Sequence, residues 1–336
     1  MASLQTWAAQ LVAAGKGILA ADESTSTCGT RLAQIKVANT EEHRRQWRDV
    51  LLTTPGLNQY VSGVILYDET IRQAALNGQP FAEVLQAAGI MPGIKVDKGI
   101  TPLAGSPAEF ITEGLDGLAG RLKEYRQRGA QFAKWRAVLT IAEDTPSVLA
   151  VRQNAEALAR YAAICQAEGI VPMVEPEVLM DGRHDLDTCH SVTEFVLHEV
   201  FNALYQHEVD FSAMILKPNM VTAGQQAVAA TPTEVAAATY ACLQYTVPAA
   251  VPGVAFLSGG QPDALATQHL DLMNKLAGGQ APWRLTYSFG RALQQAPLLA
   301  WGGETAQRGA AQAALLARCA ACSAAALGQY EDGQAA

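Results

Sequence analysis

The sequence lacks the features of a secreted, disulfide-stabilised protein. Its 336 residues include only six cysteines, a sparse set that is typical of reduced cytosolic thiols. The first residues place no basic segment before an apolar run, so we expect no signal peptide. No uncharged apolar run reaches the roughly 20 residues needed to cross a bilayer. We therefore expect a cytoplasmic protein with no membrane partner.

The sequence also lacks an excess of positive charge. Lys and Arg total 24 against 32 Asp and Glu, for a net charge of −8. A nucleic-acid partner is therefore not expected, because the chain has no basic footprint for a polyanion. A locally basic pocket can still bind an anionic small molecule. The 49% hydrophobic content allows a large core and argues against disorder.

Signals for a metal or redox centre are weak. Cys319 and Cys322 form a C-x-x-C within the Ala-rich segment 310–328, which we interpret as a packed surface helix. Four histidines lie between residues 184 and 207, but without the H-x-H or H-E-x-x-H spacing of zinc sites. We therefore predict no metal site.

Eight short apolar runs recur along the chain, and helical patterns lie between them. The runs cover 17–22, 63–69, 93–98, 132–138, 170–177, 211–217, 253–258 and 284–290, and clear helical patterns cover 40–52, 147–168, 191–207 and 232–245. This alternation predicts βαβ units and a parallel sheet. Eight units favour an α/β fold of the closed (β/α)8, or TIM barrel, type. An open doubly wound sheet is the alternative, but no G-x-G-x-x-G follows the first run.

We expect one domain over residues 1–336, with a short mobile tail after about residue 330. In such barrels the carboxyl ends of the strands carry function. Here those ends hold charged residues and glycines: Asp22, Glu69, Lys98, Lys134 with Arg136, Glu175 with Glu177, Lys217, Ser258 with Gly259 and Gly260, and Gly290 with Arg291. Three of the chain's eight lysines are in this set, which a random surface distribution would rarely produce.

Lys217 ends an apolar run and precedes Pro218. A desolvated lysine has a lowered pKa, and its neutral amine can attack a carbonyl to form a Schiff base. The alternative is a lysine that caps a strand and pairs with a carboxylate. The run itself does not decide between the two.

Two pairs of charges alternate along their runs. Lys134 and Arg136 share one face of a strand, and Glu175 and Glu177 share one face of the next. Charges on inward positions of a barrel are costly unless they pair or bind something. We favour a functional set over a purely structural ion-pair network.

The last two runs end in glycine-containing turns. Ser258-Gly259 follows one run, while Ser288, Gly290 and Arg291 end the other. Loops after the seventh and eighth strands form the usual phosphate site of these barrels, and arginine binds phosphate with two donors. Ordinary glycine turns are the alternative, and the position in the strand order favours phosphate.

Seven segments closely resemble class I fructose-bisphosphate aldolases. They are residues 15–24, 93–99, 132–136, 170–177, 216–222, 256–261 and 290–293, and the similarity runs in order from about residue 13 to 330. The resemblance implies a (β/α)8 lyase, usually a homotetramer, that needs no metal or other cofactor. It also implies reversible cleavage of fructose 1,6-bisphosphate to dihydroxyacetone phosphate and glyceraldehyde 3-phosphate, in glycolysis and gluconeogenesis.

The resemblance also implies roles for individual residues. Lys217 would form the Schiff base, Glu175 would handle protons, and Asp22 would accept the proton of the C4 hydroxyl. Lys134 would lower the pKa of Lys217, with Glu177 and Arg136 in support. The substrate's C1-phosphate would bind Ser258, Gly259, Gly290 and Arg291, with Ser288 beside them, and its C6-phosphate would bind Lys98, Ser24, Thr27 and Arg31.

The sequence departs from animal members in two ways that matter for function. Thr30 stands where they carry a lysine, which predicts a weaker grip on the C6-phosphate. They also extend further, to a terminal Tyr that assists proton exchange, and we do not assign this role to Tyr330. Two alternatives follow: an aldolase for another ketose phosphate (sedoheptulose 1,7-bisphosphate or fructose 1-phosphate), or a catalytically silent binding scaffold.

Overall fold

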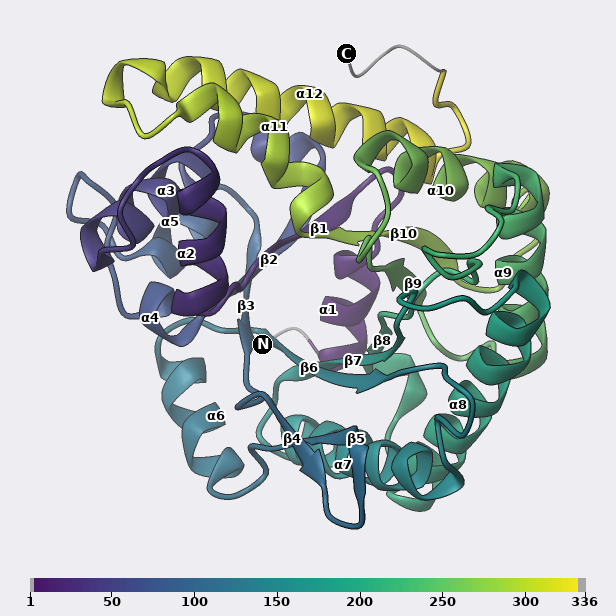
Figure 1. Ribbon diagram of the computed structural model, residues 1–336. Helices are drawn as coiled ribbons and strands as arrows, with labels where there is room; N and C mark the ends of the chain where they lie inside the picture. Colours follow the sequence, from purple (N-terminus) through teal and green to yellow (C-terminus); the bar gives the residue numbers. More distant parts are fainter. Residues whose placement is uncertain (1–2, 332–336) are drawn as a thin grey trace.

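Parallel strands close into a barrel in the part of the chain described by the computed structural model, residues 3–331 (Figure 1). Around the ring their order is β1-β10-β9-β8-β7-β6-β3-β2. The barrel strands are β1 (Gly17–Ala21), β2 (Val61–Leu66), β3 (Met91–Lys95), β6 (Phe132–Leu139), β7 (Val171–Val178), β8 (Ile215–Leu216), β9 (Gly253–Phe256) and β10 (Arg284–Phe289). The predicted single-domain (β/α)8 fold is confirmed.

Helices surround the barrel, apart from α1 (Leu4–Leu11), which packs against the interior of its amino end. The other helices are α2 (Thr25–Gln34), α3 (Glu41–Leu52), α4 (Asp68–Ile71), α5 (Phe81–Ala87), α6 (Leu118–Gln127), α7 (Val148–Ala167), α8 (Leu186–Gln206), α9 (Pro232–Thr246), α10 (Asp263–Ala277), α11 (Arg291–Trp301) and α12 (Arg308–Ala326). Side-chain caps set where several of them begin. Thr40 accepts a hydrogen bond from the His43 N–H at 3.2 Å, and Ser147 accepts one from Ala150 at 3.1 Å. The expected starts near residues 40 and 147 are therefore confirmed.

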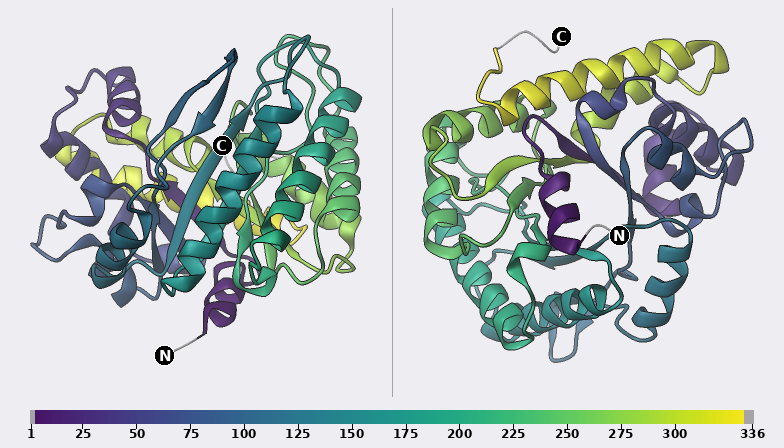
Figure 2. Two further views of the ribbon diagram at one scale, coloured as in Figure 1. Left: turned by 90° about the horizontal axis from the view of Figure 1, so that it is seen from below. Right: turned by 180° about the vertical axis from the view of Figure 1, so that it is seen from behind.

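The barrel interior is apolar at its amino end. Phe132 of β6 fills the space between Gly63 and Gly93, where an added Cβ would come within 3.0 Å and 2.2 Å of the Phe132 ring. Helix α1 packs against this layer through Ala8 and Leu11. Figure 2 shows α1 across this end of the barrel, with the β4–β5 hairpin at the opposite end. Because apolar side chains fill the amino end, any polar cavity of the barrel lies toward the carboxyl ends of the strands.

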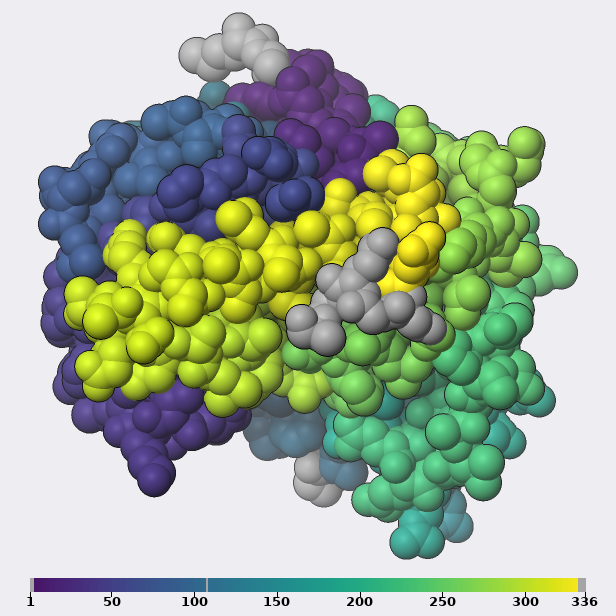
Figure 3. Space-filling view, turned by 90° about the horizontal axis from the view of Figure 1, so that it is seen from above, coloured from purple at the N-terminus to yellow at the C-terminus, as the bar shows by residue number. Residues whose placement is uncertain are grey.

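A second, larger core lies between the strands and the helices. Alternate residues of β6 belong to it, and Trp135 packs on Tyr161 of α7 with ring centroids 5.5 Å apart. Lys134, between Ala133 and Trp135, consequently points into the barrel. Helix α12 packs against α3, α10 and α11 along one side of the molecule (Figure 3), which confirms the packed helix expected at 310–328.

The structure corrects several element boundaries. The run 211–217 begins as a 3₁₀ turn, Phe211–Ala213, because the Asp210 carboxylate accepts from the Ser212 N–H at 2.9 Å. Strand β3 ends at Lys95 rather than at residue 98, and a hairpin that we did not predict follows it, β4 (Ile100–Leu103) and β5 (Ser106–Thr112). Helix α8 begins at Leu186, capped by Asp185, instead of near residue 191.

Most of the tail predicted to be mobile, residues 332–336, lies outside the described residues. Tyr330 itself is buried against α10, where its N–H donates to Asp271 Oδ1 at 2.9 Å. No helix within residues 3–331 is long and apolar enough to cross a bilayer.

Candidate active site

A cavity of about 870 Å³ opens at the carboxyl ends of the strands. All fifteen residues predicted for the site line it: Asp22, Ser24, Thr27, Arg31, Lys98, Lys134, Arg136, Glu175, Glu177, Lys217, Ser258, Gly259, Ser288, Gly290 and Arg291. They come from seven separate parts of the chain, and closure of the barrel brings them together.

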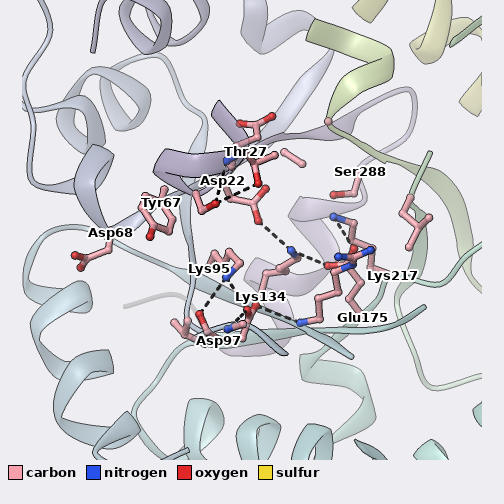
Figure 4. A pocket seen from close by; sticks show the side chains of 18 of the residues that line it. Asp22, Thr27, Tyr67, Asp68, Lys95, Asp97, Lys134, Glu175, Lys217 and Ser288 are labelled. Carbon is pink, nitrogen blue, oxygen red and sulfur yellow. Dashed lines mark hydrogen bonds and ion pairs between the residues drawn. The ribbon is translucent and has the colours of Figure 1, made fainter. Parts of the chain in front are cut away.

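Four buried side chains form a row of alternating charge across this cavity (Figure 4). Lys134 Nζ donates to Asp22 Oδ2 at 2.9 Å and lies 3.0 Å from Glu175 Oε2. The other oxygen of that carboxylate, Glu175 Oε1, lies 3.3 Å from Lys217 Nζ. Lys134 lies on β6 and Glu175 on the neighbouring β7, and Lys217 directly follows β8, the next strand of the ring. Asp22 follows β1 on another part of the ring.

The surroundings shift the pKa values of the two lysines in opposite directions. Burial lowers the pKa of Lys217, and the positive charge of Lys134 acts in the same direction, against the attraction of Glu175. Burial opposes charge on Lys134 too, but Asp22 and Glu175 outweigh it and hold the pKa of Lys134 well above its usual range. Lys217 is therefore the amine that can become neutral, and Lys134 stays an ammonium ion.

The pKa of Asp22 is also shifted by its neighbours. Burial would raise the pKa of its carboxyl, but Lys134 and Lys217 outweigh burial and hold it well below its usual range. The group is thus a carboxylate at neutral pH. A neutral amine, a carboxyl group beside it and a second carboxylate across the cavity can form an imine and accept a hydroxyl proton.

Glu177 and Arg136 form a second ion pair at the mouth of the cavity. Glu177 is buried and also lies against the loop after β9, where a Cβ on Gly259 would come within 2.8 Å of Glu177 Oε1. Glu177, held by Arg136, therefore packs directly against that loop.

On one side of Lys217, the ends of β9 and β10 present groups suited to an anion. The Ser288 hydroxyl is buried and has no hydrogen-bond partner among the described residues. Gly290 precedes α11, whose start has no side-chain cap. Because Gly290 and Arg291 line the cavity, the positive end of this helix is available to an anion there. Arg291 donates to the Gln261 carbonyl oxygen and keeps other N–H groups available.

On the opposite side, the start of α2 presents hydroxyl groups. Ser24 Oγ accepts from the Thr27 N–H at 3.3 Å and lies 3.1 Å from Thr27 Oγ1. Arg31 forms an ion pair with buried Glu23, which also binds Arg48 at 2.7 Å. Thr30 is exposed and donates to the Ser26 carbonyl at 3.3 Å, outside the cavity lining.

Sequence reasoning missed one lysine of the cavity. Lys95 ends β3 and its Nζ donates to Asp97 Oδ1 at 2.6 Å, whereas Lys98 is exposed at the rim. The alternation of β3 from Gly93 marks Lys95 as inward. The predicted run, 93–98, instead made Lys98 the strand-end residue. Glu69, another predicted strand-end residue, is held by Arg44 at 2.6 Å and 2.8 Å.

The C-x-x-C motif and the histidines between residues 184 and 207 form no catalytic or metal site among the described residues. Cys319 and Cys322 are buried free thiols of α12, and burial raises the pKa of both. Within residues 3–331, no three His, Cys, Asp or Glu side chains are grouped so that they could hold a metal ion.

Fold and site together define a (β/α)8 barrel with a buried amine and carboxylates in a cavity at the carboxyl ends of its strands. Comparison with known proteins is specific. The family model "Glycolytic: Fructose-bisphosphate aldolase class-I" matches residues 3–336. The chain therefore belongs to the class I fructose-bisphosphate aldolases, which are lyases that work without a metal.

Individual relatives carry the same family name. The chain is 53% identical over 323 residues to a probable class 1 fructose-bisphosphate aldolase of Xanthomonas axonopodis pv. citri, covering 96% of each protein. It is also 53% identical to the cytosolic fructose-bisphosphate aldolase 6 of Arabidopsis thaliana, over 96% of this chain and 90% of the relative.

Among solved structures, the chain resembles the fructose-bisphosphate aldolase of Plasmodium falciparum in complex with TRAP and a small-molecule inhibitor. The TM-score is 0.96 at 47% identity, over 98% of this chain and 95% of the other. Nothing in these comparisons supports the alternative substrates or the silent scaffold.

Proposed function

We propose that Lys217 carries the covalent chemistry of fructose 1,6-bisphosphate cleavage. The observation that supports this most directly is the buried Lys217 amine, 3.3 Å from Glu175 Oε1 and with a lowered pKa. Cleavage beside a carbonyl leaves an electron pair on carbon, which a protonated imine accepts far better than a ketone does. An amine that can be neutral for attack and cationic afterwards meets both needs.

In the first stage, Glu175 takes a proton from the Lys217 ammonium, and the neutral amine attacks C2 of the ketose. A C–N bond forms, and the carbonyl oxygen takes up the proton that the nitrogen loses. Glu175 then delivers its own proton to the resulting hydroxyl, which leaves as water. A protonated imine remains, so the protons balance without any other donor.

In the second stage, the Asp22 carboxylate accepts the proton of the C4 hydroxyl. A carbonyl forms at C4, the C3–C4 bond breaks, and its electron pair moves through C3 and C2 to the imine nitrogen. The aldehyde product, glyceraldehyde 3-phosphate, leaves first. Asp22 gives up the proton that it accepted, C3 of the enamine takes up one proton, and the protonated imine forms again. Addition of water to the imine then releases dihydroxyacetone phosphate and free Lys217.

The two anion-binding sides hold the substrate in register. The C1-phosphate binds at Ser258, Gly259, Ser288, Gly290 and Arg291, close to Lys217. The C6-phosphate binds across the cavity at Ser24, Thr27, Arg31 and Lys98, with Lys95 added from the geometry. Binding energy at both ends positions C2 and the C4 hydroxyl at their partners.

We further propose a cytoplasmic homotetramer that needs no cofactor beyond the covalent lysine. Relatives named as cytosolic support the location, and the class supports metal independence. Light scattering that gave a mass other than four times that of one chain would refute the tetramer.

Borohydride trapping tests the chemistry directly. The protein is incubated with dihydroxyacetone phosphate, with and without EDTA, reduced, digested and mapped by mass spectrometry. We expect one stable adduct on Lys217, undiminished by EDTA. An adduct on another lysine, or none, would overturn the assignment.

A matched pair of variants sharpens this test. Lys217→Met should abolish both the adduct and the cleavage of fructose 1,6-bisphosphate. Lys123→Met removes a lysine whose side chain is 66% exposed, and it should leave both unchanged. Loss of the adduct in both variants would point to a general effect of removing positive charge.

A further inference from the structure

Arg318 of α12 is a buried cation that the proposed mechanism does not use. Only 5% of the residue is exposed. In the described part of the chain, its guanidinium donates hydrogen bonds to backbone carbonyls and a hydroxyl rather than to a carboxylate. Burying an arginine without a carboxylate partner is costly, so its position calls for an explanation.

The hydrogen bonds of Arg318 join the first turns of two other helices. Nε donates to the Ala292 carbonyl of α11 at 3.1 Å. Nη2 donates to the Asp263 carbonyl of α10 at 3.0 Å and to Thr267 Oγ1 at 2.9 Å. Helix α12 packs along both helices (Figure 3), and this one side chain links their amino ends.

Those two helix starts directly follow the loops assigned to the C1-phosphate. Helix α10 begins at Asp263, just after the loop 258–261, and α11 begins at Arg291, just after Gly290. Neither start has a side-chain cap. On the cavity side, Arg291 donates to the Gln261 carbonyl, so the two loops are linked in front by Arg291 and behind by Arg318.

The charge of Arg318 also acts near this point. Burial raises the pKa of Asp263, while Arg291, Arg318 and Arg31 all act in the opposite direction. Of the three, Arg318 lies directly against this helix start, since its Nη2 donates to the Asp263 carbonyl. A buried charge is screened by salt much less than a surface charge, so Arg318 can add to the attraction for an anion at the loops.

We propose that Arg318 is a positioning residue for the substrate's C1-phosphate. It fixes the separation of the amino ends of α10 and α11, and it supplies a buried positive charge behind the two phosphate-binding loops. This inference rests on the proposed function, in which Ser258, Gly259, Gly290 and Arg291 bind that phosphate.

The test uses Arg318→Met and Arg318→Lys in the full chain. Arg308→Lys is the matched control, because Arg308 lies on the same helix but pairs with Asp49 and donates to Thr53 next to α3. For each variant we would measure KM and kcat for fructose 1,6-bisphosphate and the melting temperature. The concentration of dihydroxyacetone phosphate that half-saturates borohydride trapping reports on the C1-phosphate alone.

Arg318→Met should raise KM and the half-saturating concentration about tenfold, with kcat within about threefold of the unmodified protein. Arg318→Lys should recover part of the affinity because it keeps the charge. Arg308→Lys should lower the melting temperature without changing either concentration.

Lower melting temperatures with unchanged affinities in both Arg318 variants would show a purely structural role and overturn the inference. If Arg318→Met does not fold, Arg318→Lys decides alone, since wild-type affinity in that variant contradicts the need for the two-helix hydrogen bonds. Absence of a Lys217 adduct in the unmodified protein would instead refute the proposed function. The two failures are therefore distinct.

Discussion

Lys134 Nζ lies 2.9 Å from Asp22 Oδ2, so one ion pair spans the barrel between strands that are not neighbours. The same ammonium group contacts Glu175 at 3.0 Å. A single fixed cation thus holds both acidic groups of the proposed mechanism in place while it disfavours a proton on Lys217.

Lys134→Met should move imine formation to higher pH. The reaction needs neutral Lys217, so its rate rises as pH increases through the pKa of that lysine. Removing the positive charge of Lys134 raises this pKa, since Lys134 lowers it. The rate of borohydride trapping, measured against pH, should show a higher midpoint, and kcat should fall about 10²–10³-fold.

Lys134→Arg is the matched control because it keeps the charge. It should keep the midpoint of the trapping profile even where the rate falls. A midpoint that does not move in Lys134→Met would show that Lys134 does not tune Lys217.

Asp22→Asn should separate imine formation from carbon–carbon cleavage. The amide cannot accept the C4 hydroxyl proton, so kcat for fructose 1,6-bisphosphate should fall about 10²–10⁴-fold. The dihydroxyacetone phosphate adduct on Lys217 should persist, because that reaction has no C4 hydroxyl. Asp116→Asn, at an exposed position, should affect neither measurement. Equal loss of adduct and cleavage in Asp22→Asn would contradict the assignment.

Lys95 should matter more than Lys98 for the C6-phosphate. Lys95 is inward and half-buried beside Asp97, whereas Lys98 is exposed. A charge-assisted hydrogen bond to phosphate is worth enough that Lys95→Met should raise KM for fructose 1,6-bisphosphate roughly tenfold. Lys98→Met should raise it less. KM for fructose 1-phosphate, which lacks the second phosphate, should not change in either variant. The reverse order would favour the original assignment of Lys98.

Gly259→Ala should weaken substrate binding through a steric contact. The new Cβ would lie 2.8 Å from Glu177 Oε1, so either Glu177 or the phosphate loop must shift. We expect KM to rise several-fold, about what a small displacement of a binding group costs. Gly120→Ala, in a helix with open space around the added Cβ, should leave KM unchanged. A wild-type KM for Gly259→Ala would show that the loop adapts freely.

Thr30→Lys tests the departure from animal sequences. A lysine side chain is long enough to bring a positive charge from α2 toward the C6-phosphate side. The preference for fructose 1,6-bisphosphate over fructose 1-phosphate, taken as a ratio of kcat/KM values, should rise a few-fold. An unchanged ratio would remove Thr30 as a determinant of specificity.

Local patterns in the sequence were enough to predict the fold and much of the site. Strands and helices alternate visibly, and caps such as Ser147 mark helix starts. Lys217 after an apolar run, and the period-two pairs on β6 and β7, mark the inward charges. Boundaries were less predictable where a single side chain turns the chain, as Asp210 does before β8.

The sequence by itself determined the barrel, the family and the strand ends on which function lies, because these depend on short-range periodicity and on motifs within one segment. Only the tertiary structure decided which charges meet. Asp22 reaches Lys134 because closing the barrel brings inward positions of distant strands within 3 Å. Lys95 replaces Lys98 as the inward lysine because the strand ends earlier, and Arg318 reaches the starts of α10 and α11 because α12 packs against both helices. Such contacts join residues that are far apart in the chain, and no local pattern encodes them.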